Sequence, residues 1–253
     1  MSEAETAYTR IFITLTRRHG EIETFRRLVT AGEPLVSAHA SAEGERFVNA
    51  MLTDPEFDQY FLDRKKAIEF FGGPDALRAS LTHDKMSTLR RIVDTASIVL
   101  MHTALDAALT DLCRLAALLR PTDWESRLER QQVSLASVKS EPYSALLKTK
   151  LDDHLDTLER DSLLRRSDVL FAVCRPPAAY ALLEGYVWDR AELERLDRLR
   201  HDLVHGRLES QAIPDVGKNV EYLLKTGLFF WGMLHDTYDV KMDPLWMLHG
   251  KTT

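Results

Sequence analysis

The chain has 253 residues, of which 45% are hydrophobic and 28% charged, a balance typical of a soluble globular protein and not of a disordered one. Its formal net charge of −6 excludes a broadly basic surface that coats nucleic acid indiscriminately, although a local site stays possible. The two cysteines follow no metal-binding spacing, the N-terminus has no apolar signal core, and no uninterrupted apolar run reaches membrane-spanning length. We therefore expect a cytoplasmic protein without a membrane segment.

The N-terminal part predicts short helices, separated by glycine and proline residues. We place them at about 4–18, 21–31, 42–52, 55–71 and 74–83. Gly20 separates the first two, the second ends near Gly32 and Pro34, and Gly72-Gly73-Pro74 is the sharpest break in the chain. The apolar run at 11–15 fits a short strand equally well.

The longest predicted helix runs from about Lys85 to Leu119 and ends before Pro121. Between Ala96 and Leu105 it is apolar nearly all round, so we expect it at the centre of the protein. Beyond a mixed, partly looped segment at 122–140, further helices are expected near 143–160, 177–187, 190–205 and 216–237.

These patterns predict an all-α protein in three parts. Residues 1–83 form an N-terminal helical extension or a small subdomain. Residues 84–240 form a helical bundle, and residues 241–253 are a C-terminal tail.

The helix expected at 190–205 carries the most informative residues of the chain. Asp189 is a suitable N-cap, Glu192 is its expected capping-box partner, and Gly206 is a suitable residue just after the end. Arg200 lies within the apolar stripe of this helix, where an unpaired cation is costly. The stripe consists of Leu193, Leu196, Leu199, Leu203 and Val204.

Two histidines occupy the other side of the same helix. By helical geometry His201 and His205 lie about 40° apart, whereas Arg200 and His205 lie about 140° apart. A guanidinium can bind a phosphate with two hydrogen bonds, and a neutral imidazole can take or give a proton near pH 7. These residue types suit RNA cleavage through the ribose 2′-hydroxyl, provided that the last turn distorts or a second subunit supplies one group.

The segment Arg200-His201-Asp202-Leu203-Val204-His205, followed by glycine, resembles the R-x4-6-H signature of HEPN domains. The apolar segment 103–109 is similar to the early core helix of that family, with Asp106 as its acidic residue. The resemblance implies a HEPN-like helical bundle and a metal-independent endoribonuclease that acts on RNA. It also implies a homodimer with the site at the interface, and a role as a toxin or phage-defence effector with an antitoxin or regulatory protein as a further partner.

Roles for the individual residues follow from this resemblance and from their charges. Arg200 holds the scissile phosphate, His205 does acid–base work, and His201 supports both. Asp106 or Asp94 is a possible partner for the guanidinium of Arg200, although an aspartate on a solvated edge of the central helix explains Asp106 slightly better.

Other interpretations of the same residues stay open. Arg200 could be a buried salt-bridge residue and His205 a helix C-cap, which gives a non-catalytic module that binds RNA or protein. His201 and His205 also imitate a zinc-protease helix, but Asp202 replaces the required glutamate and no third ligand is evident, so we expect no metal. No P-loop or dinucleotide-binding motif is present, so we expect no cofactor.

Overall fold

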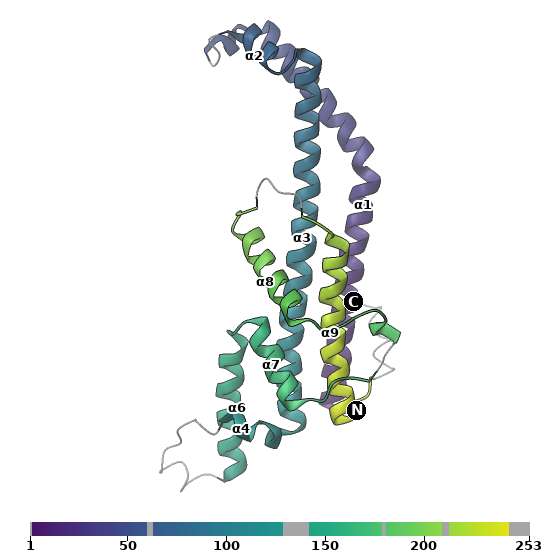
Figure 1. Ribbon diagram of the computed structural model, residues 1–253, viewed down its shortest axis with the longest axis vertical. Helices are drawn as coiled ribbons and strands as arrows, with labels where there is room; N and C mark the ends of the chain where they lie inside the picture. The colour runs from purple at the N-terminus through teal and green to yellow at the C-terminus, as the bar shows by residue number, and fades with distance from the viewer. Residues whose placement is uncertain (1, 60–62, 129–141, 179–180, 209–212, 243–253) are drawn as a thin grey trace. The chain divides into compact units, whose positions relative to one another are not determined.

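The computed structural model describes residues 2–59, 63–128, 142–178, 181–208 and 213–242. Throughout these ranges the regular elements are helices and none is a strand, so the predicted all-α fold is confirmed (Figure 1). The α-helices are α1 (Glu3–Thr53), α2 (Arg64–Phe70), α3 (Pro74–Leu119), α4 (Glu125–Leu128), α6 (Tyr143–Glu159), α7 (Leu163–Val173), α8 (Arg190–Val204) and α9 (Val216–Tyr238). Short 3₁₀ turns lie at Pro55–Gln59, Pro121–Trp124 and Ala181–Leu183.

Helix α1 is one continuous helix of 51 residues, so the predicted interruptions at Gly20, Gly32 and Pro34 are wrong, as is the strand alternative at 11–15. A glycine inside a helix costs only about 1 kcal/mol relative to alanine, which tertiary packing can offset. Apolar residues of α1 are buried near both of its ends, among them Leu15 and Val48.

The break between helices that was predicted at Gly72-Gly73-Pro74 is confirmed. Both glycines have positive φ, at 86° and 102°, a conformation that other residues rarely adopt. Pro74 then occupies the first position of α3, where its missing N–H costs nothing. No second break occurs near His83, so the short helix predicted at 74–83 and the long one predicted from Lys85 are a single helix.

Among the later elements, α6 and α9 agree closely with the helices predicted near 143–160 and 216–237. Helix α7 was not predicted; Ser162 caps it by accepting a hydrogen bond from the Arg165 N–H at 3.3 Å. The helix predicted at 177–187 is wrong, because the described part of that range holds only a three-residue 3₁₀ turn. Most of the segment predicted to be partly looped lies outside the described residues.

The chain divides into two compact units whose borders fall inside α1 and α3 and not near residue 83. Unit 1 comprises residues 1–21, 98–210 and 215–253. Unit 2 comprises residues 22–97 and 211–214. The first turns of α1 thus belong with the bundle that follows residue 97.

In unit 1, α9 packs closely against the start of α1 and the later part of α3. The rings of Tyr8 and Trp231 stack with centroids 4.5 Å apart, and the indole N–H of Trp231 donates to the carbonyl of Tyr8 at 3.1 Å. At Gly227 the helices approach so closely that an added Cβ would lie 2.8 Å from a methyl group of Leu15 and 3.5 Å from one of Leu105. The region around Gly227 is therefore a tightly packed part of the core.

Unit 2 is built from the second part of α1, α2 and the first part of α3. Its core consists of Val48, Met51, Ile68 and Leu77. Ion pairs also join the two long helices of this unit: the guanidinium of Arg90 donates to both carboxylate oxygens of Glu33, at 2.7 and 2.8 Å.

Among the described helices, α3 alone contains an 18-residue window apolar enough to cross a membrane, with a mean hydropathy of 1.4. Half of that window is buried inside the protein, and the core helix of a soluble protein passes the same test.

Candidate functional site

The candidate site lies at the C-terminal end of α8 in unit 1. Asp189 caps the beginning of this helix, and its side chain accepts from the Ala191 N–H at 2.8 Å. The expected capping box does not form, because the N–H of Asp189 donates to the Tyr222 hydroxyl and Glu192 pairs with Arg195. Leu193 and Leu196 are fully buried, so the first part of the predicted apolar stripe faces the core, whereas Val204 at its end is 51% exposed.

Arg200 is half-buried one turn before the end of α8. Its Nε atom is buried, and in the described part of the chain it has no hydrogen-bond partner. A buried donor without an acceptor is unfavourable, and most such groups in proteins are satisfied. The Nε–H of Arg200 is thus an unsatisfied donor in the protein interior.

The two histidines of the motif lie next to this arginine along the helix and are both exposed. The ring centroids of His201 and His205 are 4.3 Å apart, and the planes are inclined by 56°. His205 is also the C-cap of α8, and its backbone N–H donates to the carbonyl of His201 at 3.1 Å. Gly206 follows with a φ of 67°, which agrees with its predicted position after the helix end.

Asp106 does not pair with Arg200. Its carboxylate accepts a hydrogen bond from Arg166 of α7, which is 2% exposed and also donates to the carbonyl of Glu159 at 2.7 Å. The Asp106 side chain is 45% exposed, so it lies at a solvated edge, as the alternative interpretation of this residue held. Asp94, the other suggested partner of Arg200, lines a cleft in unit 2 beside Arg26, and burial raises the pKa of its carboxyl.

A second polar pair, absent from the predicted site, lies beneath α8. His102 of α3 is 4% exposed, and its Nε2 atom lies 2.9 Å from Oδ1 of Asp197. The hydrogen bond with His102 is the main cause that lowers the pKa of Asp197, and the charges of Arg200 and His201 lower it further. The only sequence signal for this pair was a histidine inside the most apolar part of α3.

The other arginines around the motif are held in ion pairs. Arg195 pairs with Glu192 at 2.6 Å, Arg198 pairs with Glu194, and Arg207 contacts Asp202 at 3.3 Å. Such pairs are typical of a solvated helix, and each shares its positive charge with a carboxylate.

The described residues contain no group of three or more His, Cys, Asp or Glu side chains that could hold a metal ion. His201 and His205 are a pair without a third ligand of this kind in that part of the chain. A zinc site of the protease type needs three protein ligands, and the described residues supply only these two.

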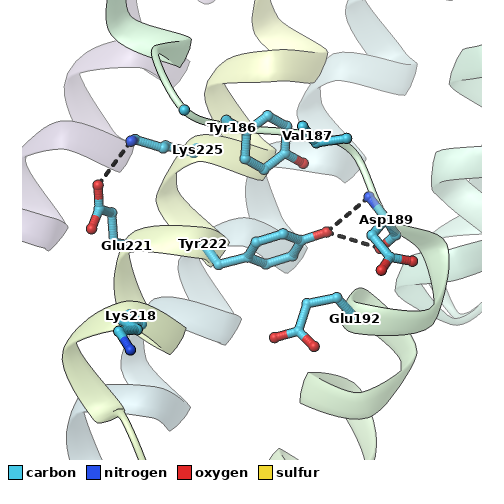
Figure 2. A pocket seen from close by; sticks show the side chains of 9 residues that line it. Tyr186, Val187, Asp189, Glu192, Lys218, Glu221, Tyr222 and Lys225 are labelled. Carbon is cyan, nitrogen blue, oxygen red and sulfur yellow. Dashed lines mark hydrogen bonds and ion pairs between the residues drawn. The ribbon is translucent and has the colours of Figure 1, made fainter.

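A hollow of about 470 Å³ lies at the opposite end of α8 from the motif. Figure 2 shows the Tyr222 hydroxyl hydrogen-bonded to the backbone of Asp189, and Lys225 paired with Glu221. Burial raises the pKa of Tyr222, whose hydroxyl donates to the Asp189 carbonyl at 2.8 Å. The two hydrogen bonds between Tyr222 and the backbone of Asp189 tie the beginning of α8 to α9. We therefore assign the residues around this hollow a structural role.

Comparisons with models of protein families, with curated proteins and with solved structures give no match to this chain.

Proposed function

We propose that the chain is a metal-independent endoribonuclease of the HEPN type, which works in the cytoplasm as a homodimer. The observation that carries this proposal is Arg200, whose buried Nε–H lacks an acceptor among the described residues. His201 follows it directly and His205 lies five residues after it, and the two exposed imidazoles are in mutual contact. The resemblance of this segment to the R-x4-6-H signature supports the same conclusion.

The proposed chemistry uses each side chain for one task. Arg200 binds the non-bridging oxygens of the scissile phosphate and stabilises the charge that develops on them. His205 takes the proton of the ribose 2′-hydroxyl as that oxygen forms a bond to phosphorus. The bond from phosphorus to the 5′-oxygen breaks, the leaving oxygen receives a proton, and the products end in a 2′,3′-cyclic phosphate and a 5′-hydroxyl. His201 supports the site and is available as the acid that donates this second proton.

The geometry of α8 supports the proposed homodimer. On a regular helix Arg200 and His205 point about 140° apart, and α8 is regular up to Val204. One copy of the motif therefore presents its guanidinium and its last imidazole in different directions. Two copies that face each other place the arginine of one subunit opposite the histidine of the other.

The test is incubation of purified protein with total RNA in excess EDTA, beside the variants Arg200→Ala and His205→Ala. Arg198→Ala is the matched control, because Arg198 lies on the same helix and its ion pair with Glu194 is exposed. Wild type and Arg198→Ala should cleave, whereas the two motif variants should lose at least about a hundredfold in rate. Cleavage by Arg200→Ala or His205→Ala at the wild-type rate overturns the assignment.

A second candidate function is a non-catalytic module that binds RNA or protein with the same helices. The ion pairs of Arg195, Arg198 and Arg207 favour its protein-binding form, because they leave less free positive charge to follow an RNA backbone. Growth on overexpression separates the two: a ribonuclease slows growth and His205→Ala does not, whereas a binding module gives the same growth with either form.

We further propose that the ribonuclease serves as a toxin or phage-defence effector under the control of an antitoxin or regulatory protein. The net charge of −6 supports a partner of this kind, because a protein with an excess of negative charge attracts bulk RNA weakly. Loss of growth inhibition when a neighbouring gene is co-expressed would identify such a partner.

A further inference from the structure

A cleft of about 590 Å³ in unit 2 has no role in the proposed ribonuclease. Its volume falls within the range of roughly 300–1,000 Å³ that small-molecule sites occupy. Helix α1 lines it with residues between Glu23 and Glu33, and α3 lines it with Arg90, Val93 and Asp94. All of these residues belong to unit 2, so the cleft is a feature of one compact unit and is separate from the motif at the end of α8.

The cleft is lined by equal numbers of positive and negative side chains, and most of them neutralise each other. Arg26 pairs with Glu23 at 3.1 Å, and the guanidinium of Arg90 donates to both carboxylate oxygens of Glu33. One guanidinium and one carboxylate of the lining are left over. These belong to Arg27 and Asp94, neither of which forms a hydrogen bond or an ion pair with another described residue.

The two remaining groups call for opposite charges on a ligand. Asp94 is half-buried, and a carboxylate that loses water without gaining a partner is unfavourable. Burial raises the pKa of this carboxyl, and the charge of Arg26 offsets that effect only in part. An ammonium group would stabilise the Asp94 carboxylate. Arg27 is exposed, and its guanidinium can hold a carboxylate with two hydrogen bonds.

We propose that this cleft binds a small zwitterion, an amino acid or a short peptide, with the ligand ammonium at Asp94 and the ligand carboxylate at Arg27. The balance of charge favours this class of ligand, because a purely cationic ligand is repelled by Arg27 and a purely anionic one by Asp94. Val29 of α1 and Val93 of α3 offer apolar surface to an aliphatic side chain. The proposal is independent of the ribonuclease function.

The experiment is isothermal titration of the full-length protein with L-leucine and with leucyl-leucine. Each ligand is compared with its N-acetyl form, which lacks the ammonium, and with its C-terminal amide, which lacks the carboxylate. The variants are Asp94→Asn and Arg27→Gln. Glu45→Gln and Arg46→Gln are the matched controls, because they remove the same charges from exposed positions of α1 outside the lining of the cleft.

Wild type and both controls should bind at least one zwitterion, and capping either end of that ligand should weaken binding about tenfold or more. Asp94→Asn should bind the zwitterion no better than its N-acetyl form, and Arg27→Gln should bind it no better than its amide. Tighter binding of leucine indicates a free amino acid as the ligand, and tighter binding of leucyl-leucine indicates a short peptide.

The proposal is overturned if wild type binds neither zwitterion at up to about 10 mM, or binds the capped forms equally well. Affinity for the zwitterion that is unchanged in Asp94→Asn overturns it too. The capped ligands test the site on the wild-type protein, so the result stands even if a variant fails to fold. Neither outcome depends on whether the protein cleaves RNA.

Discussion

Arg166 and Arg200 of unit 1 both lose contact with water on folding, and the protein offers their guanidinium groups different hydrogen-bond partners. The guanidinium of Arg166 donates to Asp106 and to the carbonyl of Glu159, but its Nε, like that of Arg200, is buried without an acceptor among the described residues. A desolvated donor without a partner reduces stability, and in Arg166 the two hydrogen bonds offset this cost.

The two arginines should differ in how much their replacement changes stability. Arg166→Met should lower the free energy of unfolding by about 2 kcal/mol, because two hydrogen bonds are lost and their acceptors stay behind. Arg200→Met should change it by less than about 0.5 kcal/mol in either direction, since it removes an unsatisfied donor and keeps an apolar chain. Urea unfolding of both variants measures these values. A larger loss for Arg200→Met than for Arg166→Met would make Arg200 a structural residue.

At the level of elements, helical periodicity identified the stretches that form helices but not where every helix begins and ends. The last helix and the helix at 143–159 follow their apolar stripes, and the Gly72-Gly73 turn needs a conformation that glycine alone adopts easily. The N-terminal helix does not stop at Gly32 or Pro34, because the local cost of these residues is smaller than the gain from packing along a long partner. Local sequence contains no measure of that gain.

The continuity of α1 has a direct consequence for Gly32. A Cβ added there meets no other atom within 4 Å, so Gly32→Ala should raise the free energy of unfolding by about 0.5–1 kcal/mol. Gly227→Ala is the matched comparison and should show no such gain, because its Cβ would lie 2.8 Å from Leu15. Thermal unfolding of both variants tests this. A Gly32→Ala protein less stable than wild type would mean that the helix is interrupted at this residue.

At the scale of the whole molecule, the candidate site was only partly predictable. The motif is contiguous, so its arginine and both histidines could be read from the sequence, as could the helix that carries them. The pairs His102–Asp197 and Asp106–Arg166 join residues 95 and 60 positions apart. Many carboxylates and cations could make such pairs, and only the packing of α3 against α7 and α8 selects among them.

A homodimeric site predicts complementation between inactive variants. Arg200→Ala keeps His205 and His205→Ala keeps Arg200, so a mixed dimer holds one intact arginine and one intact histidine on different subunits. Mixing the two proteins after mild unfolding and refolding should restore cleavage that neither shows alone. Sedimentation controls confirm that both variants form dimers. Failure to restore cleavage in verified mixed dimers would place both groups in one subunit.

The most direct test of the central claim is cleavage of one end-labelled RNA oligonucleotide in excess EDTA, beside copies that carry a single 2′-deoxy nucleotide. Attack by the 2′-hydroxyl predicts products with a 2′,3′-cyclic phosphate, and no cleavage at the bond that follows the deoxy nucleotide. Arg200→Ala and His205→Ala should leave every copy intact. Cleavage that persists at the deoxy position, or that requires a divalent metal, would contradict the account.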